Sequence, residues 1–181
     1  MVSTPPSSGR HPTMADDIVI REAERSDIAE MVSIYNDVLA ATSAIWREQP
    51  TSVGEREQWL DDKRAANHPV LVAVDTSGVL GFVAYGRFRD WPGYAKTMEH
   101  TIHVRPDMRG SGVGTQLLAS VEDRARSLGV HVMVAATDAT NQGSIRFHQR
   151  AGFVEVGRMP EVGQLRGEWR DLVLIQKIIT P

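Results

Sequence analysis

An arginine followed by three glycines at alternate positions occupies the segment from Arg109 to Gly114, which reads RGSGVG. The segment falls between a predicted strand and a predicted helix, so its backbone N–H groups would lie unshielded at the positive end of that helix. Such groups bind anions, for example a pyrophosphate, and Arg109 would add a positive charge. The open alternative is a tight glycine turn that holds no ligand.

Two familiar nucleotide-binding loops do not fit this segment. A Walker loop ends in Gly-Lys-Ser/Thr, but Gly114 is followed by Thr115 and Gln116. The dinucleotide fingerprint G-x-G-x-x-G would require a glycine at Thr115 or at Leu117. The segment is therefore a candidate anion site that belongs to neither nucleotide motif.

Glu99 is a second candidate, on the mostly apolar strand MEHTIHV that precedes the glycine loop. A carboxylate beside an anion site could accept a proton from a substrate bound next to a cofactor. The alternative is an exposed strand glutamate without a chemical role. His100 and His103 share this strand, and because side chains alternate between its faces we expect no joint metal site with Glu99. We interpret both histidines as structural or peripheral.

The segment from Asn141 to His148, NQGSIRFH, is the third candidate. Asn141 is a good helix cap, and Ser144 lies four residues before His148, hence on the same helical face. A lone histidine most often packs in a core, but the start of this helix could also reach the ligand of the glycine loop. The order of the segments along the chain does not decide between these interpretations.

Hydrophobic periodicity, caps and turns predict the helices and strands that would position these residues. Asp27 with Glu30 and Ser52 with Glu55 have the capping-box spacing, and the turn at 75–78 predicts a hairpin. Strands on both sides of a strand, glycine loop and helix unit predict one mixed α/β domain around a central sheet. The predicted helices are 27–41, 52–66, 115–128 and one that begins at Asn141; the predicted strands are 18–21, 70–74, 79–85, 98–104, 131–136, 153–157 and 171–179.

Composition limits the classes of function. The 181 residues suit one domain, and a net charge of −3 lacks the basic surplus that binds nucleic acids non-specifically. Without cysteine there is no disulfide, thiolate nucleophile or Cys-ligated zinc, and the cytoplasm is the expected compartment. Residues 1–17 contain three prolines and no apolar run, which predicts a flexible tail and neither a signal peptide nor a membrane span.

Together the three candidate segments resemble the GNAT superfamily of acyl-CoA-dependent N-acyltransferases. The loop pattern Arg/Gln-x-x-Gly-x-Gly/Ala is matched by Arg109, Gly112 and Gly114, and Asn-x-x-Ala/Ser-x-x-Phe-x-x-x-x-Gly-Phe is matched over 141–153. Within the superfamily, the chain is similar to the phosphinothricin and methionine sulfoximine N-acetyltransferases over about residues 18–178. That similarity is carried by TSAIW, by the stretch 94–104, by HVMVAATDATNQGSIRFH, and by EVG followed by Gly167-x-Trp169-x-Asp171-Leu172.

The resemblance implies an α/β (mixed α+β) domain whose central, mostly antiparallel sheet is flanked by helices, with acetyl-CoA as co-substrate and no metal. The pyrophosphate would lie on the amides from 109 to 115, and pantetheine would run along the backbone from 102 to 104. Asn141 and Ser144 would flank the cofactor on its other side. The implied cofactor-binding residues are Ile102, His103, Val104, Arg109, Gly110, Ser111, Gly112, Val113, Gly114, Thr115, Asn141 and Ser144.

The resemblance also implies roles at the reacting centre. Glu99 matches the proposed base, and His148 stands where much of the superfamily has a tyrosine that can protonate the departing thiolate. A base is chemically sensible because an amine is protonated at neutral pH and must lose a proton before it attacks a thioester. Positioning contributes more, since approximation is worth roughly 7–11 kcal/mol and proton transfer about 10²–10⁴-fold.

On the acceptor side, the resemblance places Arg89, Tyr94 and Thr101 against an amino-acid substrate. A guanidinium suits a carboxylate or a sulfone or phosphinate oxygen pair because its donors form a bidentate fork. The alternative for the segment GRFRDWPGY is a solvated basic loop. Trp46 and Trp169 could wall the same pocket or pack in the core.

Some positions depart from the family pattern. Ser111 stands where the loop often has Lys or Arg, which would weaken cofactor affinity. Leu165 and Arg166 stand where relatives often show a Lys-Phe pair, so specificity could differ.

The leading interpretation is a cytoplasmic enzyme that transfers acetyl from acetyl-CoA to the α-amine of a small amino acid or analogue by direct transfer in a ternary complex. Methionine sulfone, methionine sulfoximine and phosphinothricin are the expected acceptors, with no nucleic-acid or membrane partner and a homodimer implied by relatives. One alternative acceptor is a drug amine, polyamine or peptide N-terminus. The other alternative is a non-catalytic acyl-CoA or amino-acid binding protein.

Overall fold

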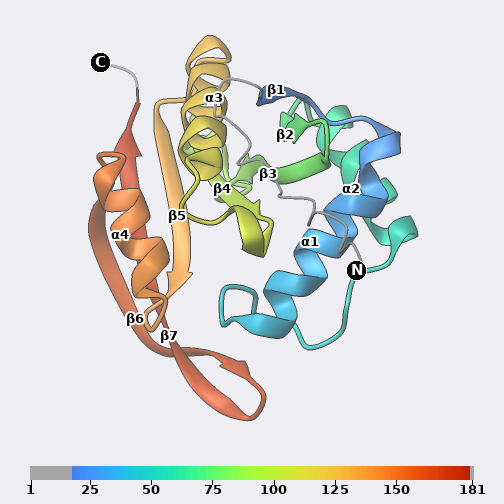
Figure 1. Ribbon diagram of the computed structural model, residues 1–181. Helices are drawn as coiled ribbons and strands as arrows, with labels where there is room; N and C mark the ends of the chain where they lie inside the picture. Colours follow the sequence, from blue (N-terminus) through green and yellow to red (C-terminus); the bar gives the residue numbers. More distant parts are fainter. Residues whose placement is uncertain (1–17, 180–181) are drawn as a thin grey trace, which may run out of the picture.

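Alternating apolar side chains divide the central sheet into two faces. In the computed structural model, which describes residues 18–179, Leu71 and Ala73 of β2 pack into one buried cluster while Val70 and Val72 pack into another. Helices α1 and α2 cover the second face, and α3 and α4 cover the first (Figure 1). The four helices are α1 (Ile28–Ala41), α2 (Val53–Ala65), α3 (Val113–Ser127) and α4 (Gln142–Arg150).

Seven strands form one sheet in the order β1-β2-β3-β4-β5-β7-β6. Every neighbouring pair is antiparallel except β4 and β5, so the expected mixed, mostly antiparallel sheet flanked by helices is confirmed. The strands are β1 (Val19–Glu22), β2 (Val70–Asp75), β3 (Gly78–Arg87), β4 (Thr97–Val104), β5 (Val132–Asp138), β6 (Val154–Leu165) and β7 (Glu168–Ile178). The tail expected over 1–17 lies outside the described residues.

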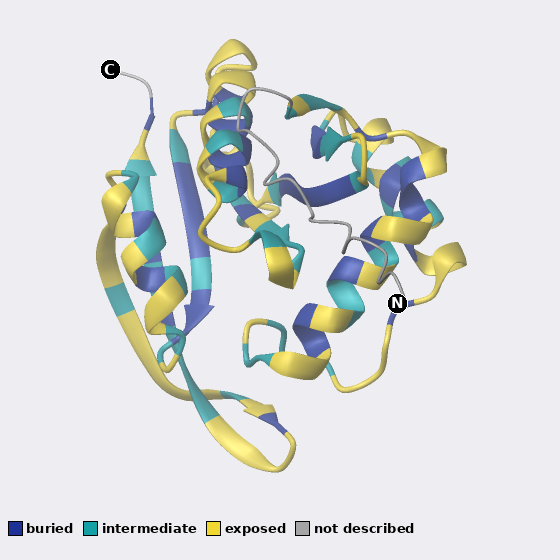
Figure 2. Ribbon diagram, viewed as in Figure 1, coloured by how far each residue is buried: buried dark blue, intermediate teal, exposed yellow. Residues whose placement is uncertain are grey.

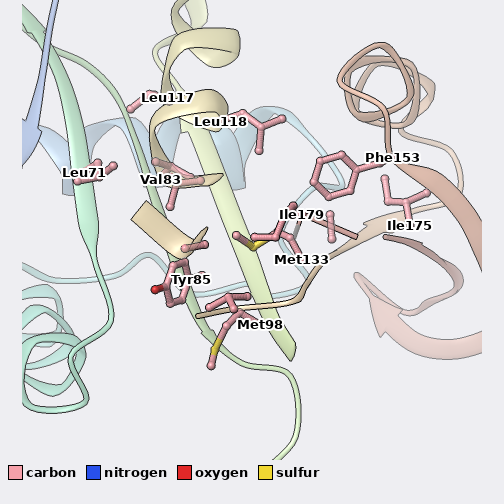
Figure 3. Close-up of a cluster of buried hydrophobic side chains, with 14 of the residues drawn as sticks. Leu71, Val83, Tyr85, Met98, Leu117, Leu118, Met133, Phe153, Ile175 and Ile179 are labelled. Atoms are coloured by element: carbon pink, nitrogen blue, oxygen red, sulfur yellow. The ribbon is translucent and has the colours of Figure 1, made fainter. Parts of the chain in front are cut away.

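The larger core cluster joins α3 to both halves of the sheet. Leu117 and Leu118 of α3 pack with Val83 of β3 and Met133 of β5, and Phe153 extends the cluster beneath α4 (Figure 3). Because this single core holds α3 and the strands on either side of it, the loop that starts α3 is fixed relative to β4.

Helix starts follow the predicted caps in one case and not in the other. Ser52 and Glu55 form the predicted capping box of α2. The prediction that Asp27 and Glu30 form such a box is wrong, because the Asp27 carboxylate accepts from the Glu24 backbone N–H at 2.8 Å and pairs with Arg21. The box therefore lies one turn earlier, on a short 3₁₀ turn (Arg25–Asp27), and Glu30 instead accepts from the Val79 N–H at 2.7 Å.

Two other boundaries differ from expectation. Helix α3 begins at Val113, two residues before Thr115, because Gly112 adopts a left-handed φ of 92° and lets the helix start directly after it. Strands β6 and β7 are longer than expected over 153–157 and 171–179, and they form an extended hairpin that is largely exposed (Figure 2). Exposed hairpin residues carry no burial periodicity, which is why the sequence did not predict this extension.

The two parallel strands stay together only at one end. β4 and β5 pair at Thr97–Glu99 with Val132–Val134, and β5 then continues to Asp138 paired with β7 alone. Residues 102–104 of β4 pair with β3 on their other side. The sheet is therefore split beyond Glu99, at the edge of β4 that faces β5.

Candidate active site

The glycine loop and the first turn of α3 present backbone donors, although the N–H groups of Arg109 and Ser111 already donate to the carbonyls of Pro106 and Met108. Gly110 and Gly112 both have left-handed φ values, 81° and 92°, in open space. No side chain caps α3, so the N–H groups of its first turn have no partner within the helix. Arg109 is exposed beside them. Val113 offers the solvent only its backbone, because its side chain lies in the core.

Gly114 joins the three segments that the sequence singled out. A Cβ built on Gly114 would lie 3.4 Å from the ring of Phe147 on α4 and 3.6 Å from Val104 at the end of β4. The loop, the split edge of β4 and α4 therefore meet at one point. On α4, the Asn141 side chain accepts from the Ser144 N–H at 3.1 Å, as a cap.

Glu99 faces α1 and α2 from a position beside the split. Its partner across the β3–β4 ladder is Gly86, and the partner of Thr101 is Ala84, so small residues leave room above both side chains. Burial raises the pKa of the Glu99 carboxyl above its usual value, while the positive charges of Arg89 and Lys63 act in the opposite direction. A half-buried carboxylate with a raised pKa is a suitable proton acceptor near neutral pH.

Lys63 of α2 is a site residue that the sequence analysis missed. Its ammonium donates to the Tyr85 carbonyl at 2.9 Å, and a Cβ on Gly86 would lie 2.5 Å from its Nζ. Burial lowers the pKa of Lys63, and the charge of Glu99 opposes this effect. A lysine on an amphipathic helix carries no signal for such a contact, since the contact depends on how the helix packs on the sheet.

His103 and His100 point to opposite faces of β4. His103 shares a face with Glu99, as alternation along the strand requires of residues four apart, and packs against the rings of Tyr35 and Phe82. Burial and the charge of Arg56 lower its pKa to about 4, so at neutral pH it is an uncharged floor of the site. As a cofactor residue it would contribute its backbone only.

His148 and His100 form a buried pair beneath α4. Their Nε2 atoms lie 3.0 Å apart, and each residue is 3% exposed. The Nδ1 of His148 is 2.8 Å from the Ser144 carbonyl oxygen, which can only accept, so Nδ1 donates and Nε2 accepts from His100. Both rings are neutral: burial and the neighbouring His148 lower the pKa of His100 to about 3, and burial lowers that of His148.

The segment expected to bind the acceptor, which includes Arg89 and Tyr94, is more exposed than the strand that carries Glu99. Arg89 stacks on Phe88 at 5.1 Å from the ring centroid, and Tyr94 contacts the same ring edge-on. Arg89 is exposed, but its positive charge acts on the Glu99 carboxyl. Trp91 is also exposed, at 75%. Trp46 and Trp169 were the two tryptophans expected to wall the acceptor pocket or to pack in the core. The indole N–H of Trp46 donates to the Asp138 carboxylate at 3.0 Å, and Trp169 is exposed on the β6–β7 hairpin.

The family model for the acetyltransferase (GNAT) family matches residues 31–153, which include Glu99, the glycine loop and α4. The chain belongs to the GNAT family. A relative from Pseudomonas aeruginosa, an L-methionine sulfoximine/L-methionine sulfone acetyltransferase, is 44% identical over 163 residues, covering 90% of this chain and 95% of the relative.

Two solved GNAT-like structures are also similar. The ribosomal-protein-alanine N-acetyltransferase from Brucella melitensis is 39% identical with a TM-score of 0.86, over 88% of this chain and 99% of that one. The yncA structure from Salmonella typhimurium, solved with its cofactor acetyl-CoA, is 35% identical with a TM-score of 0.86, over 91% and 95%. This GNAT chain is therefore an acetyltransferase that uses acetyl-CoA.

The geometry of this GNAT domain fits acetyl-CoA. Side chains on Gly110 and Gly112 would fill the open space where a pyrophosphate approaches the loop amides. The split edge of β4 leaves main-chain groups of residues 102–104 for an extended pantetheine arm. Within residues 18–179 we find no group of three or more metal-ligating side chains, and no helix that is long and apolar enough to cross a membrane.

Proposed function

We propose that this acetyltransferase modifies the α-amine of a small amino acid or analogue, such as methionine sulfone, methionine sulfoximine or phosphinothricin. The position of Glu99 carries the proposal: a half-buried carboxylate beside the split in the sheet, across from Gly86. The similarity to the methionine sulfoximine and sulfone acetyltransferase from Pseudomonas aeruginosa supports the acceptor class. The similarity to the ribosomal-protein-alanine N-acetyltransferase from Brucella melitensis supports a second acceptor, a peptide N-terminus.

Each group of the site has a role in this proposal. Acetyl-CoA supplies the acetyl thioester when it is bound. The amides of Gly110, Gly112 and Gly114, with those of Val113 and Thr115, hold its pyrophosphate, and Arg109 adds charge. The N–H and the hydroxyl of Ser111 donate to the Met108 carbonyl and fix the shape of the loop. Glu99 accepts a proton from the acceptor amine, directly or through a water, so that the nitrogen lone pair becomes nucleophilic. Arg89, Tyr94 and Thr101 bind the acceptor.

His148 fits a positioning role better than that of a proton donor. A general acid must hold its proton toward the group it protonates, but the Nδ1 proton of His148 is directed at the Ser144 carbonyl. Its Nε2 is occupied by His100. We therefore propose that His148 orients the first turn of α4, and with it Ser144 and Asn141, against the cofactor. An acid role predicts that kcat of His148→Gln falls as far as that of a Glu99 variant.

The surroundings of the enzyme are part of the same proposal. We propose a cytoplasmic enzyme without nucleic-acid or membrane partners, because the chain lacks cysteine and a basic surplus. A homodimer stays a prediction from the family resemblance, and sedimentation of the purified protein tests it.

The test is thiol release from acetyl-CoA by the purified protein. The panel contains methionine sulfone, methionine sulfoximine, phosphinothricin, ordinary amino acids, an alanine-ended peptide and a polyamine. Turnover of the first three without turnover of the peptide or polyamine supports the proposal. Turnover of the peptide alone would show that the acceptor is a peptide N-terminus and not a free amino acid. Binding of acetyl-CoA without turnover of any amine would favour a non-catalytic binding protein.

A further inference from the structure

A cavity of about 320 Å³ lies between α1, α2 and the face of β4 that carries Glu99. Thr101 and His103 line it, two and four residues beyond Glu99 on the same strand face. The opposite wall includes Arg56 and Trp59 of α2. The remaining lining residues are Tyr35, Arg47, Thr51 and Glu55.

Helix α2 presents one row of residues that runs from this cavity to Glu99. The Trp59 ring lies between two cations, with the Arg56 guanidinium carbon at 4.8 Å and the Lys63 ammonium at 5.9 Å from its centroid. Lys63 is at the Glu99 end, since its Nζ lies where a Cβ of Gly86, the ladder partner of Glu99, would lie. Arg56 is at the His103 end, since both contact the Tyr35 ring. This row of α2 therefore runs alongside residues 99, 101 and 103 of β4; the cavity itself is lined from the Arg56 end as far as Trp59 and Thr101, and Glu99 and Lys63 lie just beyond it.

Arg56 is held without an ionic partner. Its guanidinium carbon lies 3.9 Å from the centroid of the Tyr35 ring, so aromatic faces cover the guanidinium plane and leave its N–H edge for an acceptor. The residue is only 8% exposed and its Nε has no hydrogen-bond partner. Among residues 18–179 no carboxylate forms an ion pair with it, whereas buried guanidinium groups are ordinarily paired.

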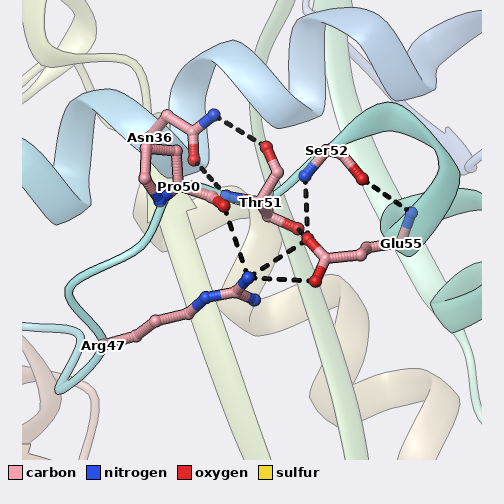
Figure 4. A network of polar contacts seen from close by, with 6 residues as sticks. All are labelled: Asn36, Arg47, Pro50, Thr51, Ser52 and Glu55. Carbon is pink, nitrogen blue, oxygen red and sulfur yellow. Dashed lines mark hydrogen bonds and ion pairs between the residues drawn. The ribbon is translucent and has the colours of Figure 1, made fainter.

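The other charges of the cavity already neutralise each other. Arg47 contacts both carboxylate oxygens of Glu55, at 3.0 and 3.1 Å. Glu55 also accepts from the Thr51 hydroxyl and the Ser52 N–H, so its carboxylate is fully engaged (Figure 4). With His103 uncharged, the charge of Arg56 is the surplus of the cavity, which favours an anionic or strongly polar oxygen group in the ligand.

The spacing of Arg56 and Lys63 along α2 decides between the α-carboxylate and the side-chain oxygens of the acceptor. The two residues are seven positions apart on one helix, so their Cα atoms are separated by a rise of about 10 Å. In an amino acid the amine and the α-carboxylate share one carbon, whereas sulfonyl or phosphinate oxygens lie at the far end of the side chain. An amine at Glu99 therefore places the distal oxygens, and not the α-carboxylate, toward Arg56.

We infer that Arg56 is a specificity-determining residue that binds the side-chain oxygen pair of the acceptor while its amine lies at Glu99. The inference rests on the proposed acetylation of amino acids and assigns the acceptor class: amino acids whose side chain ends in a sulfonyl, sulfoximine or phosphinate group. Thr101, between Glu99 and His103, lies along the bound side chain.

The test compares Arg56→Met and Arg56→Lys with the wild type. Met keeps an unbranched stem as long as that of Arg up to Nε and removes the charged guanidinium, and Lys keeps the charge but loses the planar fork. Acceptors are phosphinothricin, methionine sulfone, methionine sulfone α-carboxamide and norleucine, which has no side-chain oxygen. For Arg56→Met we expect kcat/KM to fall roughly 10- to 100-fold with phosphinothricin, the value for a hydrogen bond to a charged group. We expect a smaller fall with the sulfone and its carboxamide, and no fall with norleucine.

Arg124→Met is the matched control. Arg124 is about half exposed on α3 and lies on a different helix from the cavity residues, so this variant should behave as the wild type with every acceptor. Arg56→Lys should lie between wild type and Arg56→Met. Equal losses with all four acceptors, or a loss that disappears only with the carboxamide, would overturn the assignment, since the latter places the α-carboxylate at Arg56.

Calorimetric binding of phosphinothricin, without acetyl-CoA, separates this inference from the proposed function. If the wild type turns over amino acids and Arg56→Met binds phosphinothricin equally well, the Arg56 assignment fails and the proposed function stands. If the wild type binds phosphinothricin but acetylates no amino acid, and Arg56→Met does not bind phosphinothricin, the Arg56 assignment stands and the proposed function fails. Absence of both binding and turnover in the wild type overturns both.

Discussion

The ammonium group of Lys63 lies where a side chain at position 86 would lie, directly across the β3–β4 ladder from Glu99. Side chains at such opposed positions are about 5 Å apart at Cβ. The absence of a side chain at Gly86 therefore lets the Lys63 ammonium approach the Glu99 carboxylate. The packing of α2 on β3 and β4 thus influences the pKa of Glu99.

Removal of the Lys63 charge should shift the acid limb of the pH profile. Without the cation the pKa of Glu99 rises further, so Lys63→Met should lose activity at a higher pH than the wild type, by about half a unit to one unit. The acid limb of kcat/KM measures this. Gly86→Ala should shift it in the same direction by displacing the ammonium, and Lys63→Arg should not; an unchanged limb in both Lys63→Met and Gly86→Ala contradicts the coupling.

Glu99→Gln should remove the base and retain the shape of the side chain. We expect kcat/KM for the acceptor to fall about 10²- to 10⁴-fold, with the KM for acetyl-CoA unchanged because the loop and the edge of β4 are intact. Glu57→Gln, at a partly exposed position of α2, is the control and should behave as the wild type. Wild-type turnover by Glu99→Gln would exclude Glu99 as the base.

Alanine variants of two glycines distinguish an effect on cofactor binding from an effect of backbone strain on stability. Gly112 and Gly129 flank α3, both with left-handed φ values, 92° and 75°, and both in open space. Alanine at either position should destabilise the fold by about 1–2 kcal/mol. Only Gly112→Ala should raise the KM for acetyl-CoA, because only Gly112 adjoins the loop amides. Steady-state kinetics and urea unfolding measure the two effects, and equal KM values for the two variants would argue against the loop as the cofactor site.

The His100–His148 pair should make the fold sensitive to acid. An unfolded histidine has a pKa of about 6.5, whereas the folded pKa of His100 is about 3 and that of His148 is lowered. As the pH falls below about 6.5 the unfolded chain binds more protons than the folded one, so stability decreases toward acid. Urea unfolding at pH 7 and pH 5 should show a smaller decrease for the double variant His100→Leu/His148→Leu, which removes both partners together. Equal decreases for the two proteins would show that the pair does not carry this effect.

The glycine loop and the helix cap of the proposed cofactor site were predictable because their signals are local. The glycines from 110 to 114 require backbone conformations that few other residues adopt, and Asn141 caps the helix that follows it. The hairpin at 75–78 and the Ser52–Glu55 cap were predicted for the same reason. Each of these depends on residues within a few positions of one another.

The acceptor half was not predictable from such signals. Arg56 and Lys63 are ordinary helix cations in the sequence, and only the packing of α2 on β3 and β4 directs one toward Tyr35 and the other toward Glu99. Likewise His148, a candidate donor from its family position, proves to be turned inward onto His100.

The sequence by itself determined the fold class, the order of most elements and the glycine loop, since local conformational preference and hydrophobic periodicity act over short stretches of chain. The tertiary structure alone decided which charges face one another. Burial and pairing, which set the proton affinity of Glu99 and leave the Nε of Arg56 without a hydrogen-bond partner, arise between elements far apart in the chain.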